Sequence, residues 1–388
     1  MIFPGPDLSA VEPKPTALFS ATASVSYANS WVSINGWSTP LVFTSVKEEY
    51  AALTRNAAVA DFGALWRYIV RGDGAPDYLA RVTTAPLRNL EVGESARGLI
   101  LSSTGGVVDI IDIARLGSGM FLLTCSCSHA RRLQLAARGM GVTIEDITGR
   151  VAALAIIGPE ARDTAAAAGV DAASENLASQ TTVRGIETAA RPIHVGVQPG
   201  VEIIYPYEEA LTLWERVRRA AGPTPAGLSA IDILRIEAGC PRVGVDFVSA
   251  DKITRPKQAR SPEALGLPHL APANRAWFNG RRALSAKTPA PEKALFVLVL
   301  DGEEPMPGAS VTSNGAPVGR ITSAVFSPCF RSVVAFAELP LNVDAGALKA
   351  STLENDEGFV DAKILETAES DLATAFRASL TETTESRR

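Results

Sequence analysis

The spacing of apolar and polar positions changes several times along the chain, and each spacing predicts a kind of element. Residues 151–157 form a continuous apolar run that ends in Gly-Pro, which is typical of a buried strand followed by a helix. Residues 45–58 place charges on one side and Tyr50 and Leu53 on the other, as in an amphipathic helix. The same reasoning predicts strands at 65–71, 99–101, 106–116, 120–126 and 201–205, and helices at 75–82, 128–139, 208–221, 229–237 and after 160.

The pattern changes after about residue 289, where helical spacing ends. Short strands separated by Gly, Pro or Asn are expected there, so we predict a separate all-β domain. Before it, helices and strands alternate with hairpin turns, which favours an α+β fold over a doubly wound sheet. Residues 1–45 predict an extended arm with short strands, and the polar residues 367–388 predict a mobile tail. The predicted C-terminal strands are 294–300, 310–312, 318–322 and 332–337.

Composition and charge narrow the class of protein. A length of 388 residues predicts two or three domains at about 150 residues each. The formal net charge of −5 makes a nucleic-acid backbone an improbable ligand. No apolar run approaches the roughly 18 residues of a membrane helix, the first residues do not resemble a secretory signal, and four cysteines are too few for a disulfide scaffold. We therefore expect a cytoplasmic protein that binds neither nucleic acid nor membrane.

One segment departs from this acidic average. Residues 242–282 contain eight basic and three acidic side chains. Such a block could attract a small polyanionic ligand, or it could be a solvated connection between domains, which is the commoner case.

Few motifs of known chemistry occur. Phosphate-binding glycine loops, H-E-x-x-H and C-x-x-C are all absent, so neither nucleotide-driven nor zinc-hydrolase chemistry is indicated. Cys125, Cys127 and His129 alternate in the sequence CSCSH and would share one face of a strand. Residues two apart on a strand lie about 7 Å from one another, too far for two thiolates on one zinc ion unless the chain bends. We therefore expect no metal site and interpret these residues as interior packing.

Two acids stand on the predicted strand that follows Gly105-Gly106. Asp109 and Asp112 are three positions apart and should point to opposite faces. Burying a carboxylate without partners costs free energy, so one of them is expected to line a polar cleft. Asp109 is the favoured functional candidate, because the glycines near it would let a ligand approach closely. Asp112 is equally compatible with a place facing water.

Several segments, in this order, resemble the glycine cleavage T-protein (aminomethyltransferase) superfamily. They are GGVVDIIDIARL, DITGRVAALAIIGPEAR, LRIEAGCPRVGVDF, SPEALGL, FNGRRAL and GRITSAVFSP, and the resemblance covers about residues 45–340. The superfamily includes tetrahydrofolate-dependent demethylases and the folate domains of dimethylglycine and sarcosine oxidases.

The resemblance implies a three-domain cloverleaf around a central cavity, with a C-terminal barrel or jelly roll. The implied domains interleave: 1–45 with 147–255, then 46–146 with 256–288, and finally 289–366.

The resemblance also implies a function. We expect a methyl or aminomethyl transferase, or demethylase, that uses tetrahydrofolate and a small-molecule donor. A carboxylate near folate N5 would hold a cationic donor and steer proton movement. The implied catalytic residue is Asp109, and the implied cofactor-binding residues are Gly106, Cys125, Glu202 and Arg235. The sequence predicts no oligomeric state.

Several positions depart from the family pattern. The second Asp of the family's G-G-x-x-D-D, which we take as catalytic, is Ile110 here. The family's N-A position falls at Cys125 or its neighbour, and its pterin-binding Glu aligns near Val197 or Gln198. Two alternatives therefore stay open: an enzyme of this fold that has lost folate, and a non-catalytic folate-binding protein. The K-G-C-Y-x-G-Q-E motif of folate-binding proteins that assist iron–sulfur maturation is absent.

Overall fold

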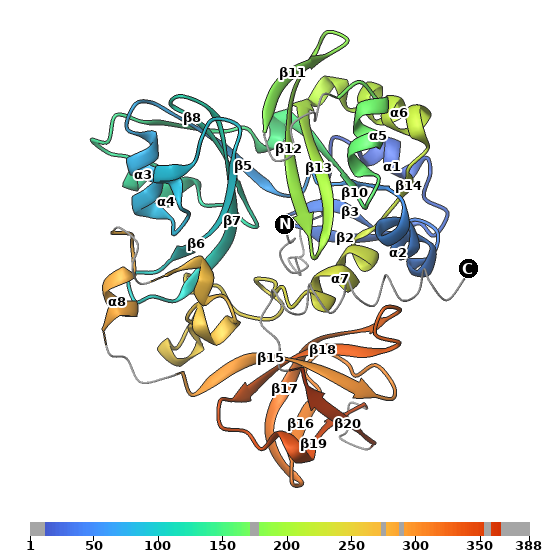
Figure 1. Cartoon of the computed structure of the whole chain (residues 1–388), viewed down its shortest axis with the longest axis vertical. Helices are drawn as coiled ribbons and strands as arrows, with labels where there is room; N and C mark the ends of the chain where they lie inside the picture. The colour runs from blue at the N-terminus through green and yellow to red at the C-terminus, as the bar shows by residue number, and fades with distance from the viewer. Residues whose placement is uncertain (1–11, 171–177, 273–276, 287–290, 353–357, 366–388) are drawn as a thin grey trace. The chain divides into compact units, whose positions relative to one another are not determined.

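The computed structural model describes residues 12–170, 178–272, 277–286, 291–352 and 358–365 (Figure 1). The chain divides into two compact units, which we describe separately. The predicted tail at 367–388 lies outside the described residues. The first unit comprises Met1–Leu101, Asp109–Ile231 and Asn274–Asn279, and the second comprises Ser102–Val108, Asp232–Ala273 and Gly280–Arg388.

A six-stranded sheet is built around the apolar run of the sequence analysis. Strand β10 (Val151–Ile157) pairs antiparallel with β13 (Gln198–Pro206) on one side and β4 (Ala58–Asp61) on the other. The run lacks polar alternation because both faces of this central strand are buried. The strand order is β11-β12-β13-β10-β4-β14, with β11 (Ser179–Val183), β12 (Ile186–Val195) and β14 (Thr224–Pro225).

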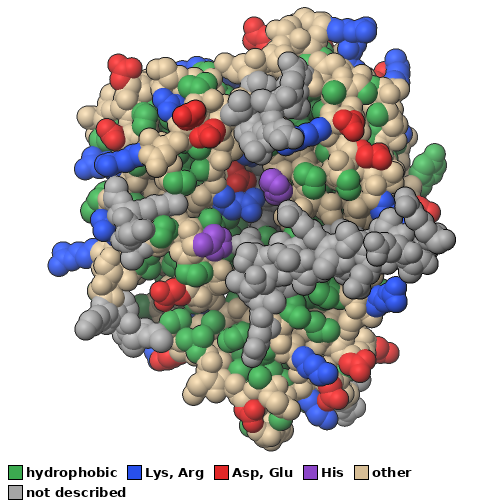
Figure 2. Space-filling model, viewed as in Figure 1, with side chains coloured by type: hydrophobic (Ala, Val, Ile, Leu, Met, Phe, Trp, Pro, Cys, Tyr) green, Lys and Arg blue, Asp and Glu red, His purple; other side chains and the backbone are tan. Residues whose placement is uncertain are grey.

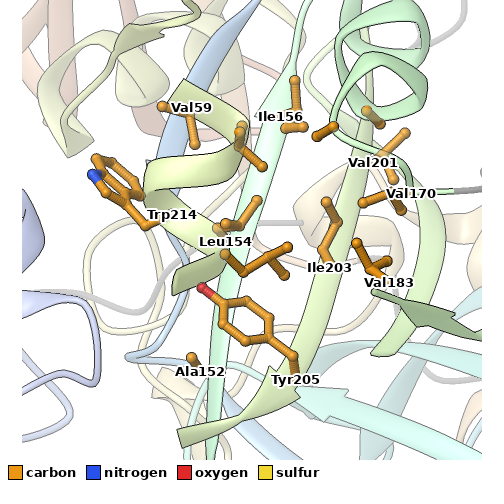
Figure 3. Close-up of a cluster of buried hydrophobic side chains, with 14 of the residues drawn as sticks. Val59, Ala152, Leu154, Ile156, Val170, Val183, Val201, Ile203, Tyr205 and Trp214 are labelled. Atoms are coloured by element: carbon orange, nitrogen blue, oxygen red, sulfur yellow. The ribbon is translucent and has the colours of Figure 1, made fainter. Parts of the chain in front are cut away.

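Helices α5 (Ala161–Ala167) and α6 (Ala210–Ala221) cover one face of this sheet (Figure 1). Figure 3 shows Leu154 of β10 and Ile203 of β13 in a cluster that also contains Trp214 of α6. Burying an apolar side chain of this size contributes roughly 1.5–3 kcal/mol. This apolar core therefore stabilises the six-stranded sheet. Other strands of the same sheet carry polar side chains of the candidate active site.

A five-stranded sheet in the order β6-β7-β8-β5-β9 carries the acids noted above. Helices α3 (Ala75–Val82) and α4 (Ala130–Ala136) lie beside this sheet (Figure 1). Its strands are β6 (Ser95–Leu101), β7 (Val107–Gly117), β8 (Met120–Cys125), β5 (Trp66–Arg71) and β9 (Thr143–Asp146).

The N-terminal region departs in part from the predicted arm. It holds a small sheet of β1 (Lys14–Pro15), β2 (Ser30–Ile34) and β3 (Trp37–Val42), as expected, but also a helix, α1 (Phe19–Ala23). Helix α2 (Val46–Arg55) confirms the predicted helix at 45–58. Its Glu49 is fully buried rather than on a solvated face, because its carboxylate accepts hydrogen bonds from the backbone N–H groups of Phe43 (2.7 Å), Thr44 (2.9 Å) and Gly227 (2.8 Å).

The second unit contains the end of α7 (Leu228–Glu237), the short helix α8 (Arg281–Ser285) and a closed six-stranded barrel. The barrel closes where β20 pairs antiparallel with β15, placing Ile364 opposite Leu298. The predicted α+β fold with an all-β C-terminal domain is thus confirmed, while the three predicted domain boundaries stay a prediction. The barrel strands are β15 (Lys293–Asp301), β16 (Ser310–Ser313), β17 (Ala316–Ser327), β18 (Ser332–Pro340), β19 (Leu348–Ser351) and β20 (Phe359–Ile364).

The surface offers no simple guide to a ligand. On the face shown in Figure 2, basic and acidic side chains are interspersed. Within the described ranges, no helix combines the length and the apolar character that crossing a membrane requires.

Candidate active site

A small pocket lies in the first unit, where β7 and β8 run side by side. Its cavity volume of about 10 Å³ is close to the space that one ordered water, or one polar group of a ligand, requires. The pocket combines an ion pair, a thiol and apolar walls. It is lined by Leu65, Arg97, Ile110, Asp112, Thr124, Cys125 and Ser126.

Asp112 supplies the negative charge of the pocket. It lies opposite Thr124 in the β7–β8 register, and its Oδ1 accepts a hydrogen bond of 3.1 Å from Arg97 Nε. Burial raises the pKa of the Asp112 carboxyl, but positive charges, of which the Arg97 guanidinium has the largest effect, outweigh burial and hold this pKa below its usual range. The pocket therefore contains an ionised carboxylate at neutral pH. Ile110, two residues earlier on the strand, lines the same pocket.

Cys125 contributes a neutral thiol. The side chain is buried at the end of β8, and burial, followed by the charge of Asp109, raises the pKa of this thiol well above its ordinary value. A protonated thiol is a weak nucleophile, so Cys125 forms part of the pocket wall rather than a reactive thiolate.

Asp109 is fully buried and is not among the residues that line the pocket. Its Oδ1 accepts a hydrogen bond from the backbone N–H of Ile110 at 2.8 Å. Its Oδ2 accepts one from the N–H of Ser126 at 3.0 Å and lies 2.9 Å from His129 Nε2. The two acids of β7 thus occupy different surroundings, as their spacing predicted. A catalytic role for Asp109 stays a prediction.

Glu202 lies at the centre of a buried ion cluster. Arg67 Nη2 donates to Oε1 at 2.6 Å, and Arg191 Nε, directly opposite in the β12–β13 register, donates to Oε2 at 2.5 Å. Burial raises the pKa of Glu202, but the two arginines outweigh it, so the pKa lies below its usual range. Arg191 Nη2 also donates to Thr124 Oγ1 at 3.4 Å, which ties the cluster to the pocket wall. Because both carboxylate oxygens accept from arginines, the cofactor-binding role of Glu202 stays a prediction with little geometric support.

Arg235 occupies an equally closed setting in the second unit. Its Nε pairs with Asp232, its Nη1 with Asp246 Oδ2 at 2.5 Å, and its Nη2 with Ser323 Oγ at 2.9 Å. The guanidinium lies 5.6 Å from the ring centre of Phe336. Arg235 thus joins α7 to barrel strands β17 and β18. These contacts are all with groups of its own unit, and a cofactor-binding role for Arg235 stays a prediction.

Gly106 also serves the packing of its own unit. Its backbone N–H donates to Ser102 Oγ at 3.1 Å, and a Cβ at this position would lie 2.9 Å from the Cβ of Ala250. The close approach that glycine permits here is therefore made by Ala250. Cofactor binding at Gly106 stays a prediction.

The basic segment at 242–282 is partly neutralised. Among the residues that the structure describes, at least three of its cations form ion pairs, one of them on the exposed surface, which favours a connection held by side chains over a free basic field. Arg275 lies outside the described residues. The pairs are Arg242–Asp232, Lys257–Glu292 and Arg260–Glu338.

Sequence reasoning missed the arginines that organise the site. Arg67 and Arg191 stand on largely apolar strands and are almost fully buried. A cation in such a stretch signals a carboxylate partner elsewhere, because an unpaired buried charge is costly. The signal is visible in WRYIVR and in IETAARPIHV, although it does not identify the partner.

Comparison with known proteins agrees with this architecture. Residues 22–256 match the GCVT N-terminal domain family, and residues 293–367 match the glycine cleavage T-protein C-terminal barrel domain. An aminomethyltransferase of Thermus thermophilus is 31% identical over 315 residues, covering 79% of this chain and 86% of the relative. An aminomethyltransferase of Deinococcus deserti is 32% identical over 337 residues, covering 83% of this chain and 87% of the relative.

A solved structure has the same fold. The glycine cleavage system aminomethyltransferase T from Bartonella henselae superimposes with a TM-score of 0.81 at 22% identity, covering 92% of this chain and 98% of that one. Together, the two family matches, the relatives above 30% identity and the shared fold confirm the predicted superfamily and the prediction of an enzyme. The chain therefore belongs to the glycine cleavage T-protein family.

Proposed function

We propose that the protein is a one-carbon transferase that uses tetrahydrofolate and a small, positively charged methyl or aminomethyl donor, with Asp112 as the acidic residue of the site. The observation that supports this most is the ionised carboxylate of Asp112 in a pocket that Ile110 also lines. Ile110 stands where we place the family's catalytic acid. A carboxylate two residues further along the same strand face lies about 7 Å away.

The polar groups that line the pocket suit either the polar edge of a reduced pterin or a positively charged one-carbon donor. Bound tetrahydrofolate would supply N5, the atom that accepts the one-carbon unit. Asp112 would hold the positive charge of the donor, and a fixed ion partner in a water-poor site stabilises charge more strongly than water does. Arg97 would keep Asp112 ionised and oriented. Ile110 and the neutral thiol of Cys125 would limit the access of water.

A displaced acid supports a donor different from the one used in glycine cleavage. Moving the negative charge along β7 moves the place where a cationic donor is stabilised. We therefore favour a methylated amine or sulfonium compound over an aminomethyl group carried by a protein.

Two measurements test this function. Calorimetry with tetrahydrofolate should show saturable binding, and incubation with tetrahydrofolate and a methyl donor should form 5-methyl-tetrahydrofolate and the demethylated donor, both detected by mass spectrometry. Sarcosine, dimethylglycine and dimethylsulfoniopropionate form a suitable donor panel, with an uncharged aryl methyl ether as the compound that should react poorly. Binding without product from any donor would instead support a non-catalytic folate-binding protein.

One observation supports a second candidate, an enzyme of this fold that no longer uses folate. Gly106, Glu202 and Arg235, three of the four predicted cofactor contacts, are engaged within the chain. Absence of folate binding at millimolar concentration would favour this candidate and exclude the first.

A further inference from the structure

We propose that Asp109, Cys127 and His129 form a binding site for one zinc ion, separate from the pocket. Asp109 comes from β7, whereas Cys127 and His129 come from the segment between β8 and α4. One oxygen, one sulfur and one nitrogen of these residues lie within 4.8 Å of one another. This is the one such group of three in the part of the chain that the structure describes.

The distances fit the geometry of a tetrahedral ion. Asp109 Oδ2 lies 2.9 Å from His129 Nε2, and Cys127 Sγ lies 3.6 Å from that nitrogen and 3.9 Å from that oxygen. With bonds of about 2.3 Å to sulfur and about 2.0–2.1 Å to nitrogen and oxygen, a tetrahedral zinc ion separates its ligands by about 3.4–3.6 Å. Side-chain shifts of about half an ångström would therefore admit the ion.

The wide spacing of alternate residues on a strand, which argued against a metal site, does not apply to Asp109, Cys127 and His129. That objection assumed a straight strand through 125, 127 and 129, but β8 ends at Cys125 and the chain bends after it. The set also replaces one of the two thiols with the Asp109 carboxylate from the neighbouring strand. The expectation of no metal site thus rested on a straight strand that the chain does not form.

A catalytic triad is a poorer explanation of the same residues. In a Cys-His-Asp relay, the two ring nitrogens of histidine serve different partners, one the nucleophile and the other the acid. Here the same nitrogen, His129 Nε2, faces both Asp109 Oδ2 and Cys127 Sγ. Three donor atoms that converge on one point are arranged for chelation rather than for proton transfer.

The surroundings hold the ligands in place and leave a route for the ion. The N–H groups of Ile110 and Ser126 donate to Asp109, and the backbone N–H of His129 donates to the Tyr68 hydroxyl at 3.0 Å. Such outer contacts are typical of metal sites, because they fix the orientation of the ligands. Asp109 and His129 are buried, whereas Cys127 is partly exposed and marks the side of entry. Water or a fourth group would complete the coordination.

The donor set selects the metal. Thiolate and imidazole ligands favour zinc over magnesium or calcium, which prefer sites made of oxygen atoms alone. The ion would connect β7 to the segment that precedes α4, directly behind the pocket wall formed by Cys125 and Ser126.

Equilibrium dialysis of the chelator-treated full-length protein against Zn²⁺, followed by elemental analysis, tests the site. About one zinc per chain is expected for the wild type, with affinity lowered at least about tenfold in Cys127→Ser and His129→Gln. Cys329→Ser and His269→Gln, which lie elsewhere in the chain, are matched controls and should bind as the wild type does. Wild-type binding below about one tenth of an ion per chain would overturn the proposal, as would unchanged binding by Cys127→Ser.

A second measurement decides the question even if the variants fail to fold. Cobalt(II) added to the wild-type apoprotein should produce the near-ultraviolet charge-transfer absorption of a cobalt–thiolate bond. Absence of this band when zinc-free protein is saturated with cobalt would overturn the site. Neither measurement depends on folate or on turnover, so both are independent of the proposed function.

Discussion

Glu202 and Asp112 are both acids paired with arginine in the first unit, yet they differ in what they leave available. Glu202 is fully buried and both of its oxygens accept from guanidinium groups, whereas Asp112 has one arginine contact at 3.1 Å and a side chain that is 15% exposed. The pKa of each carboxyl is lowered. A lowered carboxyl pKa alone therefore does not identify a ligand-binding site. What distinguishes Asp112 is that its carboxylate is partly exposed and lines a pocket.

The largest effect should follow from removing the charge of Glu202, the acid whose two oxygens are both paired with arginines. Glu202→Gln would leave Arg67 and Arg191 buried without their common anion, so the free energy of unfolding should fall by about 3–5 kcal/mol. Urea unfolding followed by circular dichroism measures this change. As a control, Glu215→Gln removes the exposed pair with Arg219 and should change the free energy by no more than about 0.5 kcal/mol. Equal effects would show that burial does not distinguish the two pairs.

Asp61 sharpens the comparison, because it is a buried acid that forms no salt bridge with any residue that the structure describes. Its carboxylate accepts from Thr16 Oγ1 at 2.6 Å and from the Gly63 N–H at 2.8 Å, and burial raises its pKa from 3.8 to about 6. The folded state therefore binds this proton more tightly than the unfolded state, so stability should fall as pH rises from about 4 to about 6 and then level off.

The shift corresponds to about 3 kcal/mol. Unfolding of the wild type and of Asp61→Asn at pH 4, 5, 6 and 7 isolates this contribution, since other groups cancel in the difference. The wild type should lose its advantage over the variant as pH rises. A difference independent of pH would contradict the raised pKa.

The role of Asp112 is tested by measuring turnover. Asp112→Asn should lower kcat by about 10²-fold, or about 2.7 kcal/mol, if this carboxylate stabilises a cationic donor. Asp163→Asn, an exposed acid on α5, is the matched control. Asp109→Asn in the same assay decides between the two acids of β7: loss of turnover in that variant, with normal turnover in Asp112→Asn, would return the catalytic role to Asp109.

The smallest effect concerns the partner of Asp112. Arg97→Lys keeps the positive charge but loses the planar guanidinium, so turnover should fall by about tenfold without abolition. Steady-state kinetics should place the loss in kcat. Arg150→Lys, which alters an exposed pair with Glu145, is the control. Wild-type kinetics in Arg97→Lys would show that the orientation of Asp112 does not depend on its arginine.

Much of the fold follows from local patterns. Strand β10 and helix α3 match their predicted bounds, because a continuous apolar run and a glycine turn before an amphipathic stretch are strong local signals. The β11–β12 hairpin was missed because its first strand is polar. Its turn, Arg184-Gly185 with φ of +47° and +90°, is the kind that joins hairpins and was the available signal.

The site depends on contacts that local patterns do not contain. Arg67 and Glu202 are 135 positions apart, so no spacing rule pairs them. The two faces of β7 could be separated from the sequence, but the face that meets a pocket could not. That choice depends on Arg97 and on β8, which only the folded sheet brings to Asp112.

The pairing of β20 with β15 has a consequence for the behaviour of the protein in solution. An open sheet presents unsatisfied backbone groups to which a strand of another molecule can add, whereas a closed one does not. The C-terminal domain, with apolar strands such as β15, thus gains protection against edge-to-edge aggregation when β20, the last strand among the described residues, closes the barrel. Truncation before β20 would expose the edge of β15 and should make the domain prone to aggregate through intermolecular strand pairing.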